Sequence, residues 1–97
     1  MSTTHAKYHF SITVQTSDTA VLHCLRGQCQ QWAGGPYPQI GWGGSDQESW
    51  RANNGKVVFR FANAAARSSF VSDATRVLGS HWQEVARSDS DPASPRR

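Results

Sequence analysis

Long apolar runs are missing from this chain of 97 residues. A helix that spans a membrane needs about 20 consecutive apolar residues, and no stretch here approaches that length, so we expect no membrane-spanning segment. The opening residues MSTTHAKYHF also lack the basic region and apolar block that mark a secretory signal peptide. We therefore expect a cytoplasmic protein.

Cysteine is scarce, since only Cys24 and Cys29 occur. Both fall in a predicted helix, where a spacing of five residues makes their side chains diverge, whereas a disulfide needs converging side chains. A zinc site would need a second pair of ligands at a suitable spacing, and the sequence supplies none. We expect two small buried thiols and no metal site.

A strong charge of either sign is absent as well. Ten Lys and Arg against seven Asp and Glu leave a net charge of +3. A protein dedicated to coating DNA usually carries a denser basic patch, so this charge permits an acidic partner without requiring one. The length suits one domain. We predict a flexible N-terminus over residues 1–6, a single domain over 7–87 and a disordered tail over 88–97.

The clearest pattern is the stretch NGKVVFRFANAAARSSFVSDATRVL at residues 54–78. It opens with the strict alternation of a half-buried strand. The predicted inward residues are Val57, Phe59 and Phe61, and the outward residues are Lys56, Val58 and Arg60. A helix over Ala64–Leu78 follows, with Phe70 on its apolar side and Arg67 on its outer side. Gly79 is predicted to end this helix.

The rest of the chain supplies four further elements and one loop. The predicted elements are a strand over Lys7–Val14, a helix over Thr19–Ala33 in which Gly27 allows close approach to the sheet, a short strand over Gln39–Trp42, a polar loop over Gly43–Arg51 and a last strand over His81–Arg87. Each helix has one apolar stripe and the strands have one apolar face. These features predict an α+β fold, a ferredoxin-like βαββαβ sandwich in which two helices cover one face of a four-stranded antiparallel sheet.

Residues 55–63, GKVVFRFAN, followed by an alanine-rich helix, resemble the third strand and second helix of the RNA recognition motif. The order of elements over residues 7–87 is also similar to that family. The resemblance implies the same fold, and in the family it implies bases stacked on exposed aromatic residues. Because Phe59 and Phe61 are predicted to face the helices, we carry over the fold and not the stacking.

Catalytic chemistry has little support in this sequence. No nucleophile, base and orienting group can be brought together, so we predict a non-enzymatic protein without a cofactor. The tryptophans are more informative, because Trp42 and Trp50 lie in or beside a glycine-rich loop. Tryptophan is frequent at binding hot spots. The alternative, that these rings close the ends of the core, stays open.

We therefore predict a small binding or regulatory module that acts on a protein or nucleoprotein through its open sheet face or the Gly/Trp loop. Such a chain would suit an accessory protein of a bacterium or phage. One alternative is a nucleic-acid-binding protein with a basic sheet face, and another is a homodimer paired through sheet faces or edge strands, with Val58 central. The candidate partner-binding residues are Lys7, His9, Lys56, Val58, Arg60, Trp42 and Trp50.

Overall fold

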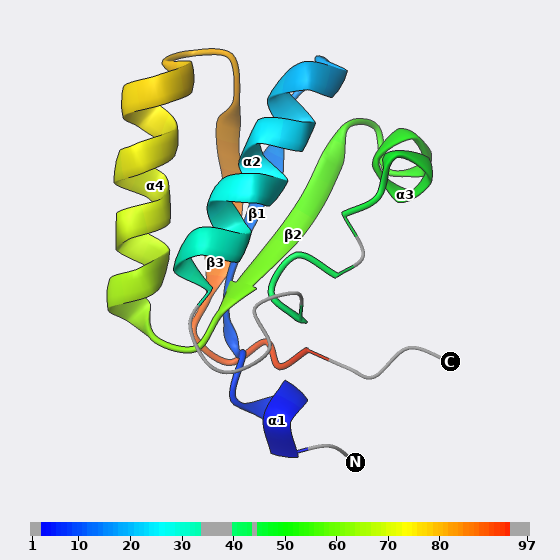
Figure 1. Cartoon of the computed structure of the whole chain (residues 1–97). Coiled ribbons are helices and arrows are strands. Elements are labelled where there is room, and N and C mark those ends of the chain that lie inside the picture. The colour runs from blue at the N-terminus through cyan, green and yellow to red at the C-terminus, as the bar shows by residue number, and fades with distance from the viewer. Residues whose placement is uncertain (1–2, 34–39, 44, 94–97) are drawn as a thin grey trace.

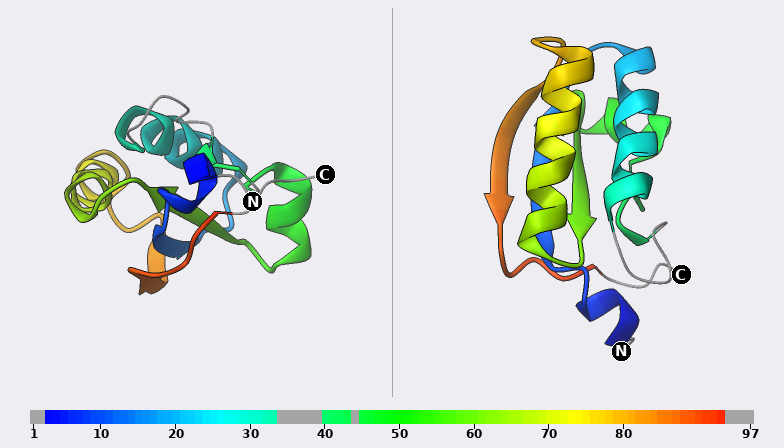
Figure 2. Two further views of the ribbon diagram at one scale, coloured as in Figure 1. Left: turned by 90° about the horizontal axis from the view of Figure 1, so that it is seen from below. Right: turned by 60° about the vertical axis from the view of Figure 1, so that its left-hand side comes forward.

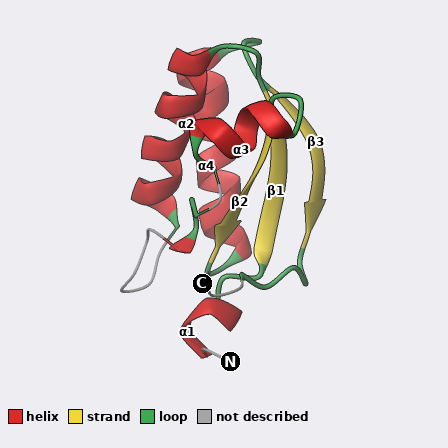
Figure 3. Ribbon diagram, turned by 90° about the vertical axis from the view of Figure 1, so that its right-hand side faces the viewer, coloured by secondary structure: helices red, strands yellow, loops and turns green. Residues whose placement is uncertain are grey.

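The computed structural model describes residues 3–33, 40–43 and 45–93. Its strands form one antiparallel sheet, and the helices α2 and α4 lie side by side on one face of it (Figures 1 and 3). The elements are α1 (Thr3–Ala6), β1 (Phe10–Gln15), α2 (Thr19–Trp32), α3 (Gln47–Ala52), β2 (Lys56–Phe61), α4 (Ala64–Leu78) and β3 (Gln83–Ser88). The fold is therefore a small α+β domain with an open sheet.

The sheet has three strands in the order β2-β1-β3, so the prediction of a four-stranded ferredoxin-like sandwich is wrong. The strand expected over Gln39–Trp42 is not formed in its described part, because Ile40–Gly43 folds as a turn; residue 39 lies outside the described residues. The segment makes one backbone contact to β2, from the Arg60 N–H to the Gly41 carbonyl at 2.8 Å. A single bond does not make a ladder.

The predicted polar loop over Gly43–Arg51 contains the helix α3, which lies beside β2 at the edge of the sheet (Figure 1). Asp46 caps the helix by accepting a hydrogen bond from the Ser49 N–H at 2.8 Å. Trp50 anchors it, because this side chain is 7% exposed and belongs to the core. The local cap and one buried ring hold a helix of only six residues.

Helices α2 and α4 match the sequence pattern closely. Asp18 caps α2 by accepting from the Ala20 N–H, and Asn63 caps α4 by accepting from the Ala66 N–H. Gly79, with φ of 59°, follows the last residue of α4 as predicted. Gly27 does not serve a close approach, because a Cβ built there meets nothing within 4 Å.

The core lies between the sheet and these two helices. Phe59 and Phe61 are fully buried, as predicted, and their ring centroids lie 5.4 and 5.1 Å from that of Phe70. Ile12 and Leu22, from β1 and α2, are equally buried. The alternation in β2 thus orients its aromatic residues toward the helices.

Regular structure and backbone hydrogen bonds continue beyond the sheet at both ends of the described chain. Residues 3–6 form α1 where we expected a flexible N-terminus. Beyond β3, where we expected a disordered tail, the Asp91 N–H donates to the His9 carbonyl at 2.9 Å and the Ala93 N–H donates to the Tyr8 carbonyl at 3.1 Å. The two segments meet at one end of the sheet (Figure 2).

Candidate functional site

The face of the sheet opposite α2 and α4 carries mostly polar side chains. Antiparallel partners point to the same face, so the strand register defines three rows across it. The rows are Ser11 with Arg60 and Ser88, Thr13 with Val58 and Ala86, and Gln15 with Lys56 and Gln83. We call these nine residues the open face. It combines hydrogen-bonding groups with two cations and one branched apolar residue.

A groove of about 510 Å³ runs along the β2 side of the open face. Its lining residues are Thr13, Gly43, Ala52, Asn53, Asn54, Lys56, Val57, Val58 and Arg60. We call this hollow the β2 groove. It brings together Lys56, Val58 and Arg60 from the predicted set, because these three residues share the outward side of β2.

The backbone of β2 also contributes to the β2 groove. The Lys56 N–H donates to the Asn53 carbonyl and the Arg60 N–H donates to the Gly41 carbonyl, so alternate residues of β2 direct their N–H groups away from β1. Val58 lies between them and, by this alternation, directs its N–H and C=O toward the groove. The groove therefore offers a backbone donor and acceptor beside the Lys56 ammonium.

Gly41 lets the turn at Ile40–Gly43 approach β2 closely. A Cβ at this position would lie 2.3 Å from the Arg60 carbonyl oxygen and 2.8 Å from the Ala33 Cβ. Only glycine allows this approach of two backbones. The turn at Ile40–Gly43 therefore covers the Arg60 end of the β2 edge.

The positive charge of Arg60 is balanced by the carboxylate of Asp91. Its Nε donates to the Asp91 carbonyl at 2.9 Å, and its Nη2 lies 3.1 Å from both carboxylate oxygens of Asp91. The side chain is 23% exposed. Sequence reasoning missed Asp91, because it lies in the polar segment expected to be disordered and no periodicity marks it.

The other two basic residues of the predicted set lie outside the strands. Lys7 is exposed and, like His9, precedes β1, which begins at Phe10 and not at Lys7. The His9 Nδ1 donates to the Asp89 carbonyl at 2.6 Å, and its ring lies 4.2 Å from the Phe10 ring. His9 thus holds the segment after β3, and the structure does not bring Lys7 into the β2 groove.

Arg67 is buried, although the sequence placed it on the outer side of its helix. Its Nη1 donates to the Ser11 and Ser88 carbonyls at 3.2 and 2.9 Å, and its Nη2 pairs with Asp89 at 2.6 Å. Arg67 therefore joins α4 to the ends of β1 and β3. Asp89 and Asp91, the two acidic residues of the segment after β3, thus each pair with an arginine.

The two candidate tryptophans both pack against the core, and they differ in burial. Trp50 is buried, and its Nε1 donates to the Thr16 carbonyl at 2.8 Å. Trp42 is partly buried, and the Arg26 guanidinium lies 4.8 Å from its ring centre. Neither ring lines the β2 groove. Of the rest of the Gly/Trp loop, residues 34–39 and 44 lie outside the described residues.

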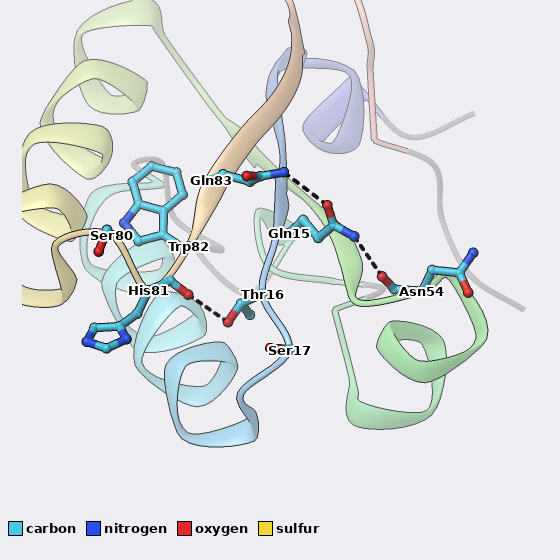
Figure 4. Close-up of a pocket in the computed structure, with 8 residues that line it drawn as sticks. All are labelled: Gln15, Thr16, Ser17, Asn54, Ser80, His81, Trp82 and Gln83. Atoms are coloured by element: carbon cyan, nitrogen blue, oxygen red, sulfur yellow. Dashed lines mark hydrogen bonds between the residues drawn. The ribbon is translucent and has the colours of Figure 1, made fainter.

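A second hollow, of about 310 Å³, lies at the end of the sheet where β1 ends and β3 begins (Figure 4). Gln83 Nε2 donates to Gln15 Oε1 at 3.2 Å, and Gln15 Nε2 donates to the Asn54 carbonyl at 3.0 Å. The Thr16 hydroxyl donates to the His81 carbonyl at 2.9 Å. These hydrogen bonds link β3, β1 and the turn before β2.

Within the described ranges, no group of three or more His, Cys, Asp or Glu side chains could hold a metal ion. Over the same ranges, no helix has the length and apolar character needed to cross a membrane. Cys24 and Cys29 are both free thiols, and burial raises the pKa of the Cys29 thiol. Comparison with known protein families, with curated proteins and with solved structures found no match.

Proposed function

We propose that this protein is a small non-enzymatic binding module that takes an extended segment of a protein partner into the β2 groove. The observation that carries the proposal is the combination, in one hollow of about 510 Å³, of the Lys56 and Val58 side chains with an edge of the Val58 backbone that bonds no other residue in the described part of the chain. An extended segment added beside a strand gains affinity from backbone hydrogen bonds and specificity from the flanking side chains. The exposed Lys56 favours an acidic residue in that segment.

A nucleic-acid partner is the second reading from the sequence, and the charges favour it less. Of the four residues expected to form a basic face, Arg60 is paired with Asp91 and His9 donates to the Asp89 carbonyl. Lys7 and Lys56 are the exposed cations of that set. Affinity for a nucleic acid grows with the number of phosphates that free cations neutralise, so this arrangement suits a protein segment better.

The test is selection of peptides from a displayed random library on the immobilised full chain. We expect selected peptides to shift the amide resonances of β2 in an NMR titration and to lose binding with Val58→Glu and with Lys56→Glu. Val77→Glu is the matched control, because Val77 is 52% exposed on α4, in the helix layer on the opposite face of the sheet. Peptide binding that Val58→Glu leaves unchanged would exclude the β2 groove.

Oligonucleotides are titrated against the same variants to separate the two partners. Binding that falls steeply with added salt and depends on Lys7 and Lys56 together would replace the proposal with the nucleic-acid alternative. Selection of no peptide under conditions in which the chain is folded would also contradict it.

A further inference from the structure

The strand β3 forms one edge of the sheet, and its side chains are exposed on both sides of the sheet. Its residues from Gln83 to Arg87 are all exposed, on the helix side as well as on the open face. The view in Figure 2 (right) shows β3 beyond α4, so the helix layer stops short of this strand. An exposed edge strand is a template for pairing with another strand.

A β-bulge changes which side chains of β3 share one side of the sheet. Thr13 pairs with Ala86 and Val14 pairs with Glu84, so Val85 is an extra residue in β3. In a regular strand, residues three apart point to opposite faces. With the bulge between them, Glu84 and Arg87 share the helix side and form an ion pair, with Nε–Oε2 at 2.6 Å and Nη2–Oε1 at 2.8 Å.

The backbone groups of the same two residues point to the free edge. The N–H groups of Lys56 and Arg60 point away from β1, so the other set of alternate residues on β2 forms the hydrogen bonds to β1. The residues of β1 that do not bond β2, which include Thr13, therefore bond β3. Their partners on β3 are Gln83, Ala86 and Ser88. Glu84 and Arg87 therefore direct their N–H and C=O groups away from β1, toward the outer edge of the sheet.

We propose that two copies of this chain pair through the edges of β3, antiparallel, around a two-fold axis at the Val85–Ala86 bulge. In this register Glu84 lies opposite Arg87 of the second copy, and Arg87 lies opposite its Glu84. Each pair joins residues on the same side of the sheet whose backbone groups face each other. The product is a continuous sheet in the order β2-β1-β3-β3-β1-β2.

Charged residues and a bulge are also common devices that protect an edge strand from unwanted pairing. An arbitrary strand would meet Glu84 and Arg87 without matching charges. A second copy in the two-fold register meets opposite charges at both positions, and such cross-strand pairs are stabilising. The same two residues thus disfavour foreign strands and favour the chain's own copy.

The interface is small, because β3 has only six residues. Stable specific interfaces bury about 1,200–2,000 Å² in total, and a single strand pair falls toward the lower end or below it. We therefore expect a weak dimer whose population depends on protein concentration. The outer edges, with the β2 groove, remain free in both copies, so the inference does not depend on the proposed function.

The test is a charge-swap experiment read by sedimentation equilibrium of the full chain. Glu84→Arg alone and Arg87→Glu alone each place like charges opposite one another twice in the dimer, and we expect each to weaken dimerisation by at least about tenfold. An equal mixture of the two variants restores both opposite-charge contacts. We expect the mixture to form a heterodimer, which native mass spectrometry separates from homodimers by mass.

The mixture is decisive because each variant still lacks its internal Glu84–Arg87 pair, so recovery must come from contacts between chains. Lys56→Glu serves as a control on the opposite edge and should leave dimerisation unchanged. Amide hydrogen exchange gives a second measurement, in which the Glu84 and Arg87 amides of the unmodified chain become protected as concentration rises. A chain that remains monomeric at high concentration, or a mixture that remains monomeric, would overturn the proposal.

Discussion

Arg67 and Asp89 are joined by an ion pair of 2.6 Å in which the arginine side chain is 7% exposed and the aspartate side chain 70% exposed. The asymmetry follows from the other partners of Arg67, which are the Ser11 and Ser88 carbonyls at the ends of β1 and β3. The buried guanidinium therefore depends more on two backbone carbonyls than on the carboxylate.

This asymmetry predicts unequal effects on stability. Arg67→Ala leaves the carbonyls of two strands without a charged donor and should lower the free energy of unfolding by about 2–3 kcal/mol. Asp89→Asn, which changes an exposed partner, should cost less than about 1 kcal/mol. Urea denaturation measures both. Arg76→Ala is the control, since Arg76 lies on the same helix with a side chain that is 73% exposed, and a loss as large as that of Arg67→Ala would contradict this account.

Two glycines should respond to alanine in opposite directions. Gly27 lies inside α2 with open space around it, so Gly27→Ala should raise the free energy of unfolding by up to about 1 kcal/mol. At Gly41 the added methyl group would meet the Arg60 carbonyl at 2.3 Å, and we expect a loss of about 1–3 kcal/mol as the turn separates from β2. Thermal unfolding of the two variants beside the unmodified chain gives the comparison, and equal shifts would count against the close approach at Gly41.

The pair on β3 should be visible in a pH titration. The hydrogen bond from Arg87 is the largest effect on the pKa of Glu84 and lowers it. Burial acts in the opposite direction. A carboxylate with a lowered pKa contributes stability above its unfolded-state pKa and loses that contribution as the pH falls through the folded-state pKa. We expect an NMR titration of the Glu84 carboxyl to show a pKa below the usual value, and Arg87→Gln to raise it. Lys56→Gln should leave it unchanged, and a Glu84 pKa insensitive to Arg87 would exclude the pair in solution.

The two thiols should react at very different rates. Cys24 is half-buried, whereas Cys29 is fully buried and its pKa is raised by burial, so little thiolate is available. A thiol reagent at neutral pH should modify one cysteine per folded chain and the second only after denaturation. In Cys24→Ser the rapid reaction should disappear, and equal reaction of both thiols would show that Cys29 is accessible.

The elements that could be predicted from the sequence are those with local signals. The bounds of α4, Ala64–Leu78, follow from the Asn63 cap, the apolar stripe and Gly79, and the burial of Phe59 and Phe61 follows from the alternation in β2. Each of these signals lies within a few residues of the feature it specifies. Sequence reasoning therefore placed the outward residues of the β2 groove correctly on one strand face.

The remaining features depend on contacts between distant parts of the chain. The turn at Gly41 is held by a bond to Arg60, α3 is anchored by the Trp50 bond to Thr16, and the acidic residues Asp89 and Asp91 reach arginines on other elements. The strand β3 is exposed on both sides, so it lacks the alternation that marks a half-buried strand. Local sequence patterns do not show which residues tens of positions apart come into contact.

The bond between the Ala93 N–H and the Tyr8 carbonyl, at 3.1 Å, has a consequence for protein engineering. The chain enters and leaves its folded core at adjoining points, at the opposite end of the sheet from the turn at Asn54. A short linker could therefore join these two points, and the backbone could be reopened at an exposed turn, to give a circularly permuted chain with the same packing. For the same reason the domain suits insertion into a surface loop of a host protein, since the host would need to separate the two ends of its loop very little.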